Sequence, residues 1–180
     1  MIKRLISLLS ALLLLISIAP ARAVDGRDIL LVYRSVGSWV YTDIIITLER
    51  DGSRTQFDVR ELPGDLRNDP ALLLAFLRTH GLNGEESAQE VPAPTKLPAM
   101  PADQAQAIAD LLPLLTEQSF EPRFDKTDAG AQLLYAPYLR DGSDRLTLLQ
   151  EDGSCVGQSD DPVAQQLIAL GLPLMRGPAD

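Results

Sequence analysis

The chain has 180 residues, a formal net charge of −9, 46% hydrophobic residues and a single cysteine. The acidic balance disfavours nucleic acid and anionic membrane surfaces as partners, because both carry negative charge. One cysteine excludes an intramolecular disulfide, so Cys155 is either a small buried side chain or a thiol that links two chains. A monomer is the simpler expectation, and a Cys155-linked dimer stays open.

The first residues have the pattern of a cleaved export signal. Lys3 and Arg4 precede the apolar run LISLLSALLLLISIA, and the tripeptide Ala-Arg-Ala at 21–23 is typical of a cleavage site. A membrane anchor is the alternative, but spanning a bilayer takes about 20 apolar residues. We therefore predict a signal peptide over 1–23 and an exported domain over 24–180. The mature protein would lie in the periplasm or outside the cell, without a stable membrane anchor.

Three strands are predicted next. The runs DILLVYRS and YTDIIITLE are rich in β-branched residues and are joined by the hairpin loop VGSW. In the second run, apolar and polar residues mostly alternate, which is typical of a sheet with one exposed face. Asp51-Gly52 predicts a hairpin turn, because glycine accepts the positive φ that such turns require. The run RTQFDVR returns as the third strand.

A helix follows the loop ELPGDLR. Asn68 or Asp69 is expected to cap it, with Pro70 in its first turn and Gly81 at its end. Its predicted apolar face consists of Leu72, Leu73, Phe76 and Leu77. Residues 82–100 are acidic at first and then rich in proline, so we predict an exposed connector there.

A second helix is predicted from about Pro101, and Pro113 should kink or end it. Its apolar face is expected to contain Ala105, Ile108, Leu111, Leu112 and Leu115. The stretch SFEPRFDKTDAG is predicted to be a loop. The run AQLLYAPYLR then predicts a strand in which Pro137 marks an edge or a bulge.

The last elements are two strands and a helix. Turns at Asp141-Gly142 and Asp152-Gly153 connect AQLLYAPYLR to DRLTLLQ and then to CVGQ. Asp160 or Asp161 is expected to cap a helix that begins at Pro162 and closes at Gly171.

The order of these elements is β-β-β-α-α-β-β-β-α. It predicts the α+β class, with a single antiparallel sheet and two or three helices packed on one face. Both halves contain a D-G-S turn and a helix opening with D-P. This similarity is explained either by an internal duplication or by the general use of these residues in turns and helix starts.

The sequence contains no recognisable catalytic constellation. The only histidine, His80, lies at a predicted helix end, where a cation suits the negative end of the helix. One His and one Cys do not supply the ligands of a typical zinc site or the members of a triad. Acid pairs such as Glu151-Asp152 and Asp160-Asp161 fall in turns and caps. We therefore predict a non-enzymatic protein with no catalytic residue, no metal and no cofactor, and keep a hydrolase with paired carboxylates as a lesser option.

Two hairpins contain the residue types that most often anchor protein interfaces. The candidate binding residues are Arg34, Ser38, Trp39 and Tyr41 in RSVGSWVY, and Tyr135, Tyr138 and Arg140 in YAPYLRDGSDR. The alternative for Trp39 is that its ring folds back over the edge of the sheet.

Several stretches together resemble the emfourin-type family of protein inhibitors of thermolysin-like metallopeptidases. They are YRSVGSW, DIIITLERDG, LPAMPADQAQAIADLLPLL, EQSFEPRF, DAGAQLLYAPYLR, RLTLLQEDGS and DDPVAQQLIAL. The resemblance covers about two-thirds of the mature chain, and residues 54–98 would be an insertion relative to the family. It implies a domain that binds or inhibits a peptidase, and it transfers no individual functional residue.

The sequence thus predicts an exported binding domain whose partner is another protein. In the inhibitory version a rigid hairpin loop would cover the cleft of a secreted metallopeptidase. The alternative is a periplasmic protein that binds a small molecule or a cell-wall fragment between sheet and helices.

Overall fold

The computed structural model describes residues 27–37, 42–60, 62, 64–79, 93–121, 123–124 and 130–176. Several features discussed above lie outside these residues. They are the predicted signal peptide, Ser38, Trp39, Tyr41, His80, Gly81 and the connector as far as residue 92.

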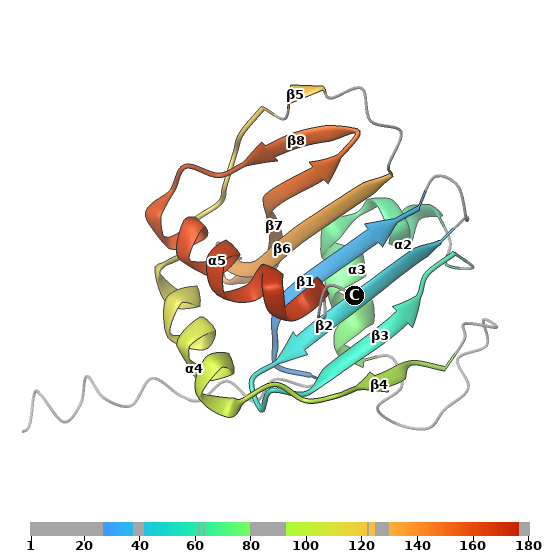
Figure 1. Ribbon diagram of the computed structural model, residues 1–180, viewed down its shortest axis with the longest axis horizontal. Helices are drawn as coiled ribbons and strands as arrows, with labels where there is room; N and C mark the ends of the chain where they lie inside the picture. The colour runs from blue at the N-terminus through green and yellow to red at the C-terminus, as the bar shows by residue number, and fades with distance from the viewer. Residues whose placement is uncertain are drawn as a thin grey trace, which may run out of the picture.

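One antiparallel sheet forms the centre of the molecule (Figure 1). Its strands are β1 (Ile29–Val36), β2 (Asp43–Glu49), β3 (Arg54–Asp58), β4 (Thr95–Leu97), β5 (Arg123–Phe124), β6 (Ala131–Arg140), β7 (Ser143–Gly153) and β8 (Cys155–Gln158). They are arranged in the order β4-β3-β2-β1-β6-β7-β8-β5. The β1–β6 pair therefore lies in the middle, and one meander of strands runs outward from each side of it.

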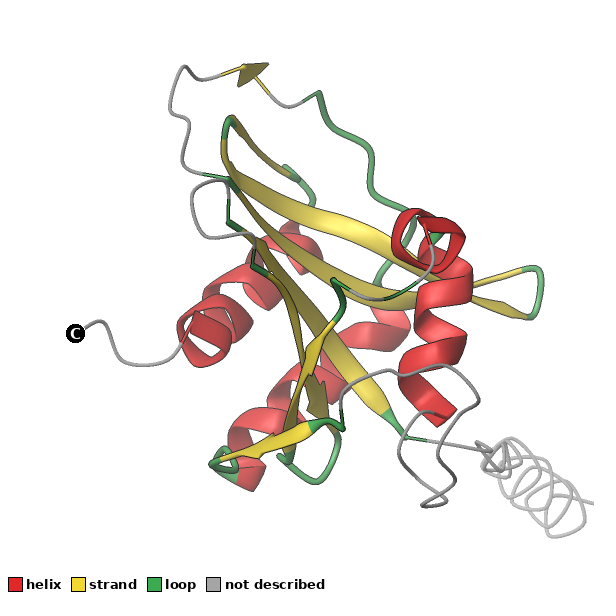
Figure 2. Ribbon diagram, turned by 90° about the vertical axis from the view of Figure 1, so that its right-hand side faces the viewer, coloured by secondary structure: helices red, strands yellow, loops and turns green. Residues whose placement is uncertain are grey.

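Helices cover both faces of this sheet. They are α2 (Gly64–Asn68) and α3 (Pro70–Thr79) on one face, and α4 (Ala102–Leu111), the short 3₁₀ helix η1 (Leu112–Leu114) and α5 (Pro162–Arg176) on the other. Figure 1 shows α3 behind the sheet and α4 and α5 in front of it, and Figure 2 shows helices on both sides. The α+β class, the antiparallel sheet and the order of the main elements are confirmed. The expectation that the helices pack on one face is wrong.

Two hydrophobic clusters, one on each face, explain this arrangement. On the α3 face, Ile45 and Phe57 of the sheet pack with Leu74 of α3. On the opposite face, neighbouring strand positions such as Ile46 pack with Ile108 of α4. Successive strand residues point to opposite faces, so the run of isoleucines in β2 supplies both clusters.

The face of β2 that the alternation assigned to solvent is buried. Asp43 is 8% exposed, and Thr47 is fully buried. Each polar side chain has a partner: Arg34 binds Asp43, and the hydroxyl of Thr47 donates to the carbonyl of Thr55 (3.4 Å). A buried polar residue is tolerated when it is hydrogen-bonded, so alternation of polarity does not guarantee exposure.

The two halves are not related by a simple rotation. If the halves were duplicated, a two-fold axis perpendicular to the sheet, between the antiparallel strands β1 and β6, would exchange the two meanders. Such a rotation does not interchange the two faces of the sheet, so the two corresponding helices would lie on the same face. The helix after β3, however, lies on one face, and the helix after β8 lies on the other. The fold therefore favours the general use of D-G turns and D-P helix starts over a duplicated unit.

Some predicted boundaries are confirmed and others are wrong. Asp69 caps α3, because its Oδ1 accepts the N–H of Ala71 (2.8 Å), and Asp161 caps α5 in the same way through Val163 (2.9 Å). Helix α4 ends at Leu111, just before Pro113, as expected. In contrast, α2, β4 and β5 form within stretches that were predicted to be loop or connector.

Helix α5 does not close at Gly171 but continues to Arg176, with Pro173 inside it. Gly171 is buried against the sheet, and a Cβ at this position would overlap the side chain of Leu31. The glycine thus permits close contact between helix and sheet, which local sequence does not distinguish from a helix stop.

Candidate functional site: the β6–β7 hairpin and an adjoining cleft

The predicted binding residues that the structure describes are divided between the two faces of the sheet. Arg34 and Tyr135 lie on the α3 face, on adjacent strands β1 and β6. Tyr138 and Arg140 lie on the opposite face, because they are an odd number of positions from Tyr135. These residues therefore do not form one surface.

Arg34 is engaged inside the protein. Its Nε and Nη2 donate to the two carboxylate oxygens of Asp43 at 2.8 and 2.6 Å, and the two side chains are 15% and 11% exposed. This bidentate hydrogen bond raises the pKa of the Arg34 guanidinium above its ordinary value. The geometry supports a structural role for Arg34 rather than a contact with a partner.

The two predicted tyrosines of β6 are largely covered. Burial raises the pKa of the Tyr135 phenol above its ordinary value, and the nearby Arg34 partly opposes this shift. Tyr138 is 8% exposed and belongs to the hydrophobic cluster beneath α4 and α5. Of the predicted binding residues within the described part of the chain, Arg140 is the one that is exposed.

Arg140 lies at the end of a long hairpin formed by β6 and β7. The strands pair as far as Arg140 and Ser143, so the loop consists of Asp141 and Gly142 alone. Both have positive φ, 51° and 74°, as in the tight turns whose twist matches that of the flanking strands. The predicted D-G turn is therefore confirmed, and it is short and conformationally restricted.

The end of this hairpin extends beyond the central sheet. Strand β1 pairs with β6 only from Ala131 to Tyr135, so the remaining residues of β6 have β7 as their one strand partner within the described chain. Figure 2 shows the turn projecting at the right, next to α3. Leu139, at the tip, is 65% exposed. Among the described residues, none forms a hydrogen bond or ion pair with the exposed side chain of Arg145.

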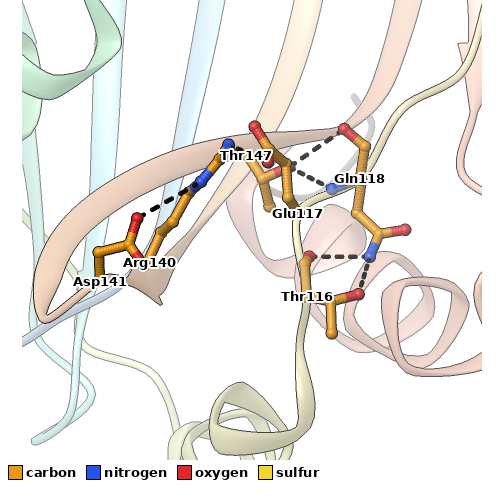
Figure 3. A network of polar contacts seen from close by, with 6 residues as sticks. All are labelled: Thr116, Glu117, Gln118, Arg140, Asp141 and Thr147. Carbon is orange, nitrogen blue, oxygen red and sulfur yellow. Dashed lines mark hydrogen bonds and ion pairs between the residues drawn. The ribbon is translucent and has the colours of Figure 1, made fainter.

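The hairpin is held from both sides. On the α3 face, Arg78 forms an ion pair with Asp144. On the other face, Nη1 of Arg140 donates to Glu117 Oε2 (2.5 Å), as Figure 3 shows. A shallow groove of about 360 Å³ lies between the start of α3 and this hairpin, and Arg145 is among its lining residues.

Glu117 belongs to the segment of residues 115–121. A polar network attaches this segment to β7, as Figure 3 shows, and to Ser159 just before α5. The backbone N–H of Gln118 donates to Thr147 Oγ1 (2.8 Å), and its side chain donates to the carbonyl of Thr116 (2.9 Å). The hydroxyl of Ser159, just before α5, donates to Gln118 Oε1. Thr147 and Ser159 are buried, so this network fixes the segment that supports Arg140.

A larger cleft lies on the other side of the 115–121 segment. It has a volume of about 860 Å³ and is open to solvent. Its lining comes from this segment, β8, the end of β7 and the residues just before α5. Its charged lining residues are Glu117, Glu121, Arg123, Glu151, Asp160 and Asp161. The side chain of Glu151 lies on the α3 face of the sheet, because Glu151 pairs with Leu133, which in turn pairs with Arg34.

Sequence reasoning placed two of the acid pairs in turns and caps and did not predict that both line one cleft. Glu151 and Asp160 lie nine positions apart along the chain but line one cleft, because β7 and β8 are paired. Leu139 and Glu117 were also missed, whereas Arg145 lies within the predicted binding hairpin YAPYLRDGSDR. The one signal in the sequence was the D-G turn, which places the residues beside it at a hairpin tip.

Cys155 lies half-buried in β8, opposite Phe124 of β5. Within the described residues, no three His, Cys, Asp or Glu side chains are placed to hold a metal ion. In the same part of the chain, no helix has the length and apolar character needed to cross a bilayer.

Comparisons with protein families, with curated proteins and with solved structures find no match to this chain. The functional argument therefore depends on the geometry above and on the sequence resemblance.

Proposed function

We propose that this chain is a non-enzymatic binding domain whose ligand is another protein, and that the β6–β7 hairpin is its main contact. The observation that supports this is the exposed tip: Leu139 is 65% exposed on a hairpin closed by two residues and held from both sides. A contact that is already ordered loses little conformational entropy on binding, which favours affinity.

The chemistry of the tip suits a protein groove. Leu139 offers apolar area, and complete burial of a leucine stabilises a complex by about 1.5–3 kcal/mol. Arg145 pairs with Tyr138 and therefore lies on the opposite face of the hairpin from Leu139, where its guanidinium is available for a carboxylate of a partner that encloses the tip. Arginine is frequent among residues that dominate interfaces. The hairpin thereby replaces the 38–41 loop as the surface on which we base the proposal.

The specific form of the proposal is inhibition of a secreted thermolysin-type metallopeptidase, and it rests on the resemblance to emfourin-type inhibitors. Export through the 1–23 signal peptide belongs to the same proposal, and amino-terminal sequencing of the protein from the periplasm or medium is expected to begin at Val24. The small-molecule alternative is less favoured, since the cleft of about 860 Å³ is open to solvent and lined mainly by polar residues, whereas small-molecule sites are usually enclosed and apolar.

The test is a titration of the purified protein into a thermolysin-type peptidase, with a gel to follow cleavage of the chain. We expect stoichiometric inhibition with the chain intact. Leu139→Asp should weaken inhibition by at least about tenfold, because a buried leucine contact of about 1.4 kcal/mol or more is lost. Leu170→Asp on α5, also at an exposed leucine, is the matched control and should inhibit like the original protein.

Three results would count against this proposal. Digestion of the chain without inhibition removes the peptidase as partner. Equal inhibition by Leu139→Asp removes the hairpin from the contact. Loss of inhibition in Trp39→Ala, with Leu139→Asp unaffected, assigns the contact to the first predicted hairpin loop instead.

A further inference from the structure

Strand β7 has a free outer edge near the tip of the hairpin. On its inner side it pairs with β6 from Ser143 to Gly153. On its outer side, β8 pairs with it at Gln150 and Glu151. Within the described chain, no backbone group pairs with the outer edge of β7 between Ser143 and Leu146. A strand edge of this kind can accept a further strand.

The two-residue turn determines which backbone groups lie on this edge. In such a hairpin the two residues that close the turn, Arg140 and Ser143, exchange hydrogen bonds. Backbone groups alternate in direction along an antiparallel strand, so the N–H and C=O of Asp144 and Leu146 point away from β6. Pro137, which pairs with Leu146, fits this register, because a proline nitrogen is tolerated where it faces out from a strand. The free edge therefore offers the N–H and C=O of Asp144 and Leu146.

A groove follows this edge of β7. It has a volume of about 360 Å³, and its lining includes Arg140 and Arg145 on one face of the hairpin and Leu146 on the other, beside the start of α3. Because both faces contribute, the groove lies along the edge of the strand. An extended chain suits such a groove, since it pairs with backbone groups and points successive side chains to opposite faces.

Arg145 is the charge of the groove that the described residues leave available. Asp69 caps α3, and Arg140 lies within 4.0 Å of both Glu117 and Asp141. The exposed guanidinium of Arg145 forms no hydrogen bond or ion pair with the part of the chain that the structure describes. A carboxylate on the same face of an added strand is complementary to it.

The α3 face of the groove offers apolar side chains. Pro70 and Ala71 lie there with Leu146, which belongs to the hydrophobic cluster beneath α3. An added strand whose central residue lies opposite Arg145 directs the residues on either side of it to this face. Apolar residues are favoured at those two positions.

We propose that the partner of the β6–β7 hairpin contributes an extended segment that pairs with β7 at Asp144 and Leu146. An acidic residue of this segment lies opposite Arg145, and an apolar residue lies on each side of it. The free edge accounts for the extended form, and the two faces of the groove account for the pattern of side chains. This inference rests on the function proposed above, because both use the hairpin, and it adds the edge and the form of the partner.

The experiment is a nuclear magnetic resonance titration of the ¹⁵N-labelled protein with the capped peptide Thr-Val-Glu-Val-Thr and its counterpart Thr-Val-Lys-Val-Thr. We expect the glutamate peptide to bind roughly threefold to tenfold more tightly, since its charge attracts Arg145 and that of lysine repels it. In the complex the amides of Asp144 and Leu146 should exchange with solvent several-fold more slowly. The amide of Arg145 already points to β6, so its exchange should change less.

Methylation of the peptide backbone separates strand pairing from side-chain contact. Methyl groups on both valine nitrogens remove the donors that face β7 and should weaken binding by at least about tenfold. A methyl group on the glutamate nitrogen, which points away from β7, is the matched control and should leave affinity within about twofold.

Variants of the protein test the same two contacts. Arg145→Gln should abolish the preference for the glutamate peptide, and Arg145→Lys should retain it. Asp144→Pro removes the outward N–H and should bind roughly threefold to tenfold more weakly than Asp144→Ala. Both lose the ion pair with Arg78, so their difference reports the backbone donor. Circular dichroism checks the fold of each variant, and Leu170→Asp, on α5, should bind like the original protein.

Equal affinity for the two peptides would remove the acidic residue from the proposal. Equal weakening by the two methylations, or unchanged exchange at Asp144 and Leu146, would overturn the strand pairing. These measurements use no peptidase, so they are separate from the inhibition test. Inhibition that depends on Leu139 without peptide binding would overturn this inference alone, and peptide binding without inhibition would overturn the peptidase as partner alone.

Discussion

Arg34 and Asp43 illustrate how burial decides what a side chain does. Both are at most 15% exposed, and two hydrogen bonds join them. In sequence, Arg34 next to a hairpin loop indicated an interface residue. In the structure its guanidinium already has a carboxylate at bidentate distance, so a partner would have to displace Asp43.

The first prediction at this scale concerns the stability of that pair. Asp43→Ala should lower the free energy of unfolding by about 3 kcal/mol, because it leaves a buried guanidinium without its carboxylate. Denaturant unfolding followed by circular dichroism measures the change.

The Asp28–Arg50 pair provides the control. Its side chains are 45% and 48% exposed, so Asp28→Ala should cost less than about 1 kcal/mol. If Asp43→Ala is as mild as Asp28→Ala, the buried pair does not have the structural role assigned to it.

At the scale of the element, the β6–β7 hairpin contains or adjoins three glycines with positive φ: Gly130 just before β6, Gly142 in the turn and Gly153 at the end of β7. The surroundings of Gly142 and Gly130 differ. A Cβ at Gly142 would meet nothing within 4 Å, whereas a Cβ at Gly130 would overlap the carbonyl oxygen of Val36. Replacement by alanine therefore tests backbone strain alone at Gly142, and backbone strain together with steric overlap at Gly130.

Gly142→Ala should destabilise the protein by about 1 kcal/mol, the ordinary cost of placing an alanine in a left-handed conformation. Gly130→Ala should cost clearly more, because the backbone of β1 must also move. Thermal unfolding of the two variants measures the difference. A larger effect at Gly142 than at Gly130 would contradict this account of the hairpin.

At the scale of the whole molecule, one sheet is shared by two helix layers. The α3 layer and the α4–α5 layer each have their own hydrophobic cluster, and both clusters use side chains from β1 and β2. Loss of packing on either face should therefore weaken strands that the other face needs, and the domain should unfold as one cooperative unit.

Leu77→Ala on α3 and Leu167→Ala on α5 test this cooperation. Both leucines are fully buried, so each substitution should cost about 2–5 kcal/mol. Native-state hydrogen exchange should show the slowest amides of α3 responding to Leu167→Ala, although this residue lies on the opposite face. A response confined to the face that was altered would show that the two layers open independently.

Local sequence determined the elements whose signals are short in range. Three features follow from the conformational preferences of a few adjacent residues. They are the D-G turn at Asp141-Gly142, the helix caps at Asp69 and Asp161, and the end of α4 before Pro113. The α+β class follows from the order of strand-like and helix-like patterns.

Only the tertiary structure decided which face each helix covers and which side chains meet. An apolar stripe on a helix requires a partner surface but does not specify which face of the sheet provides it, so α3 was placed on the same side as α4 and α5. The surroundings of Tyr138 and Gly171 depend on strand pairing and helix docking over long sequence distances. These contacts form by burial of apolar area in three dimensions, which no local pattern of residues encodes.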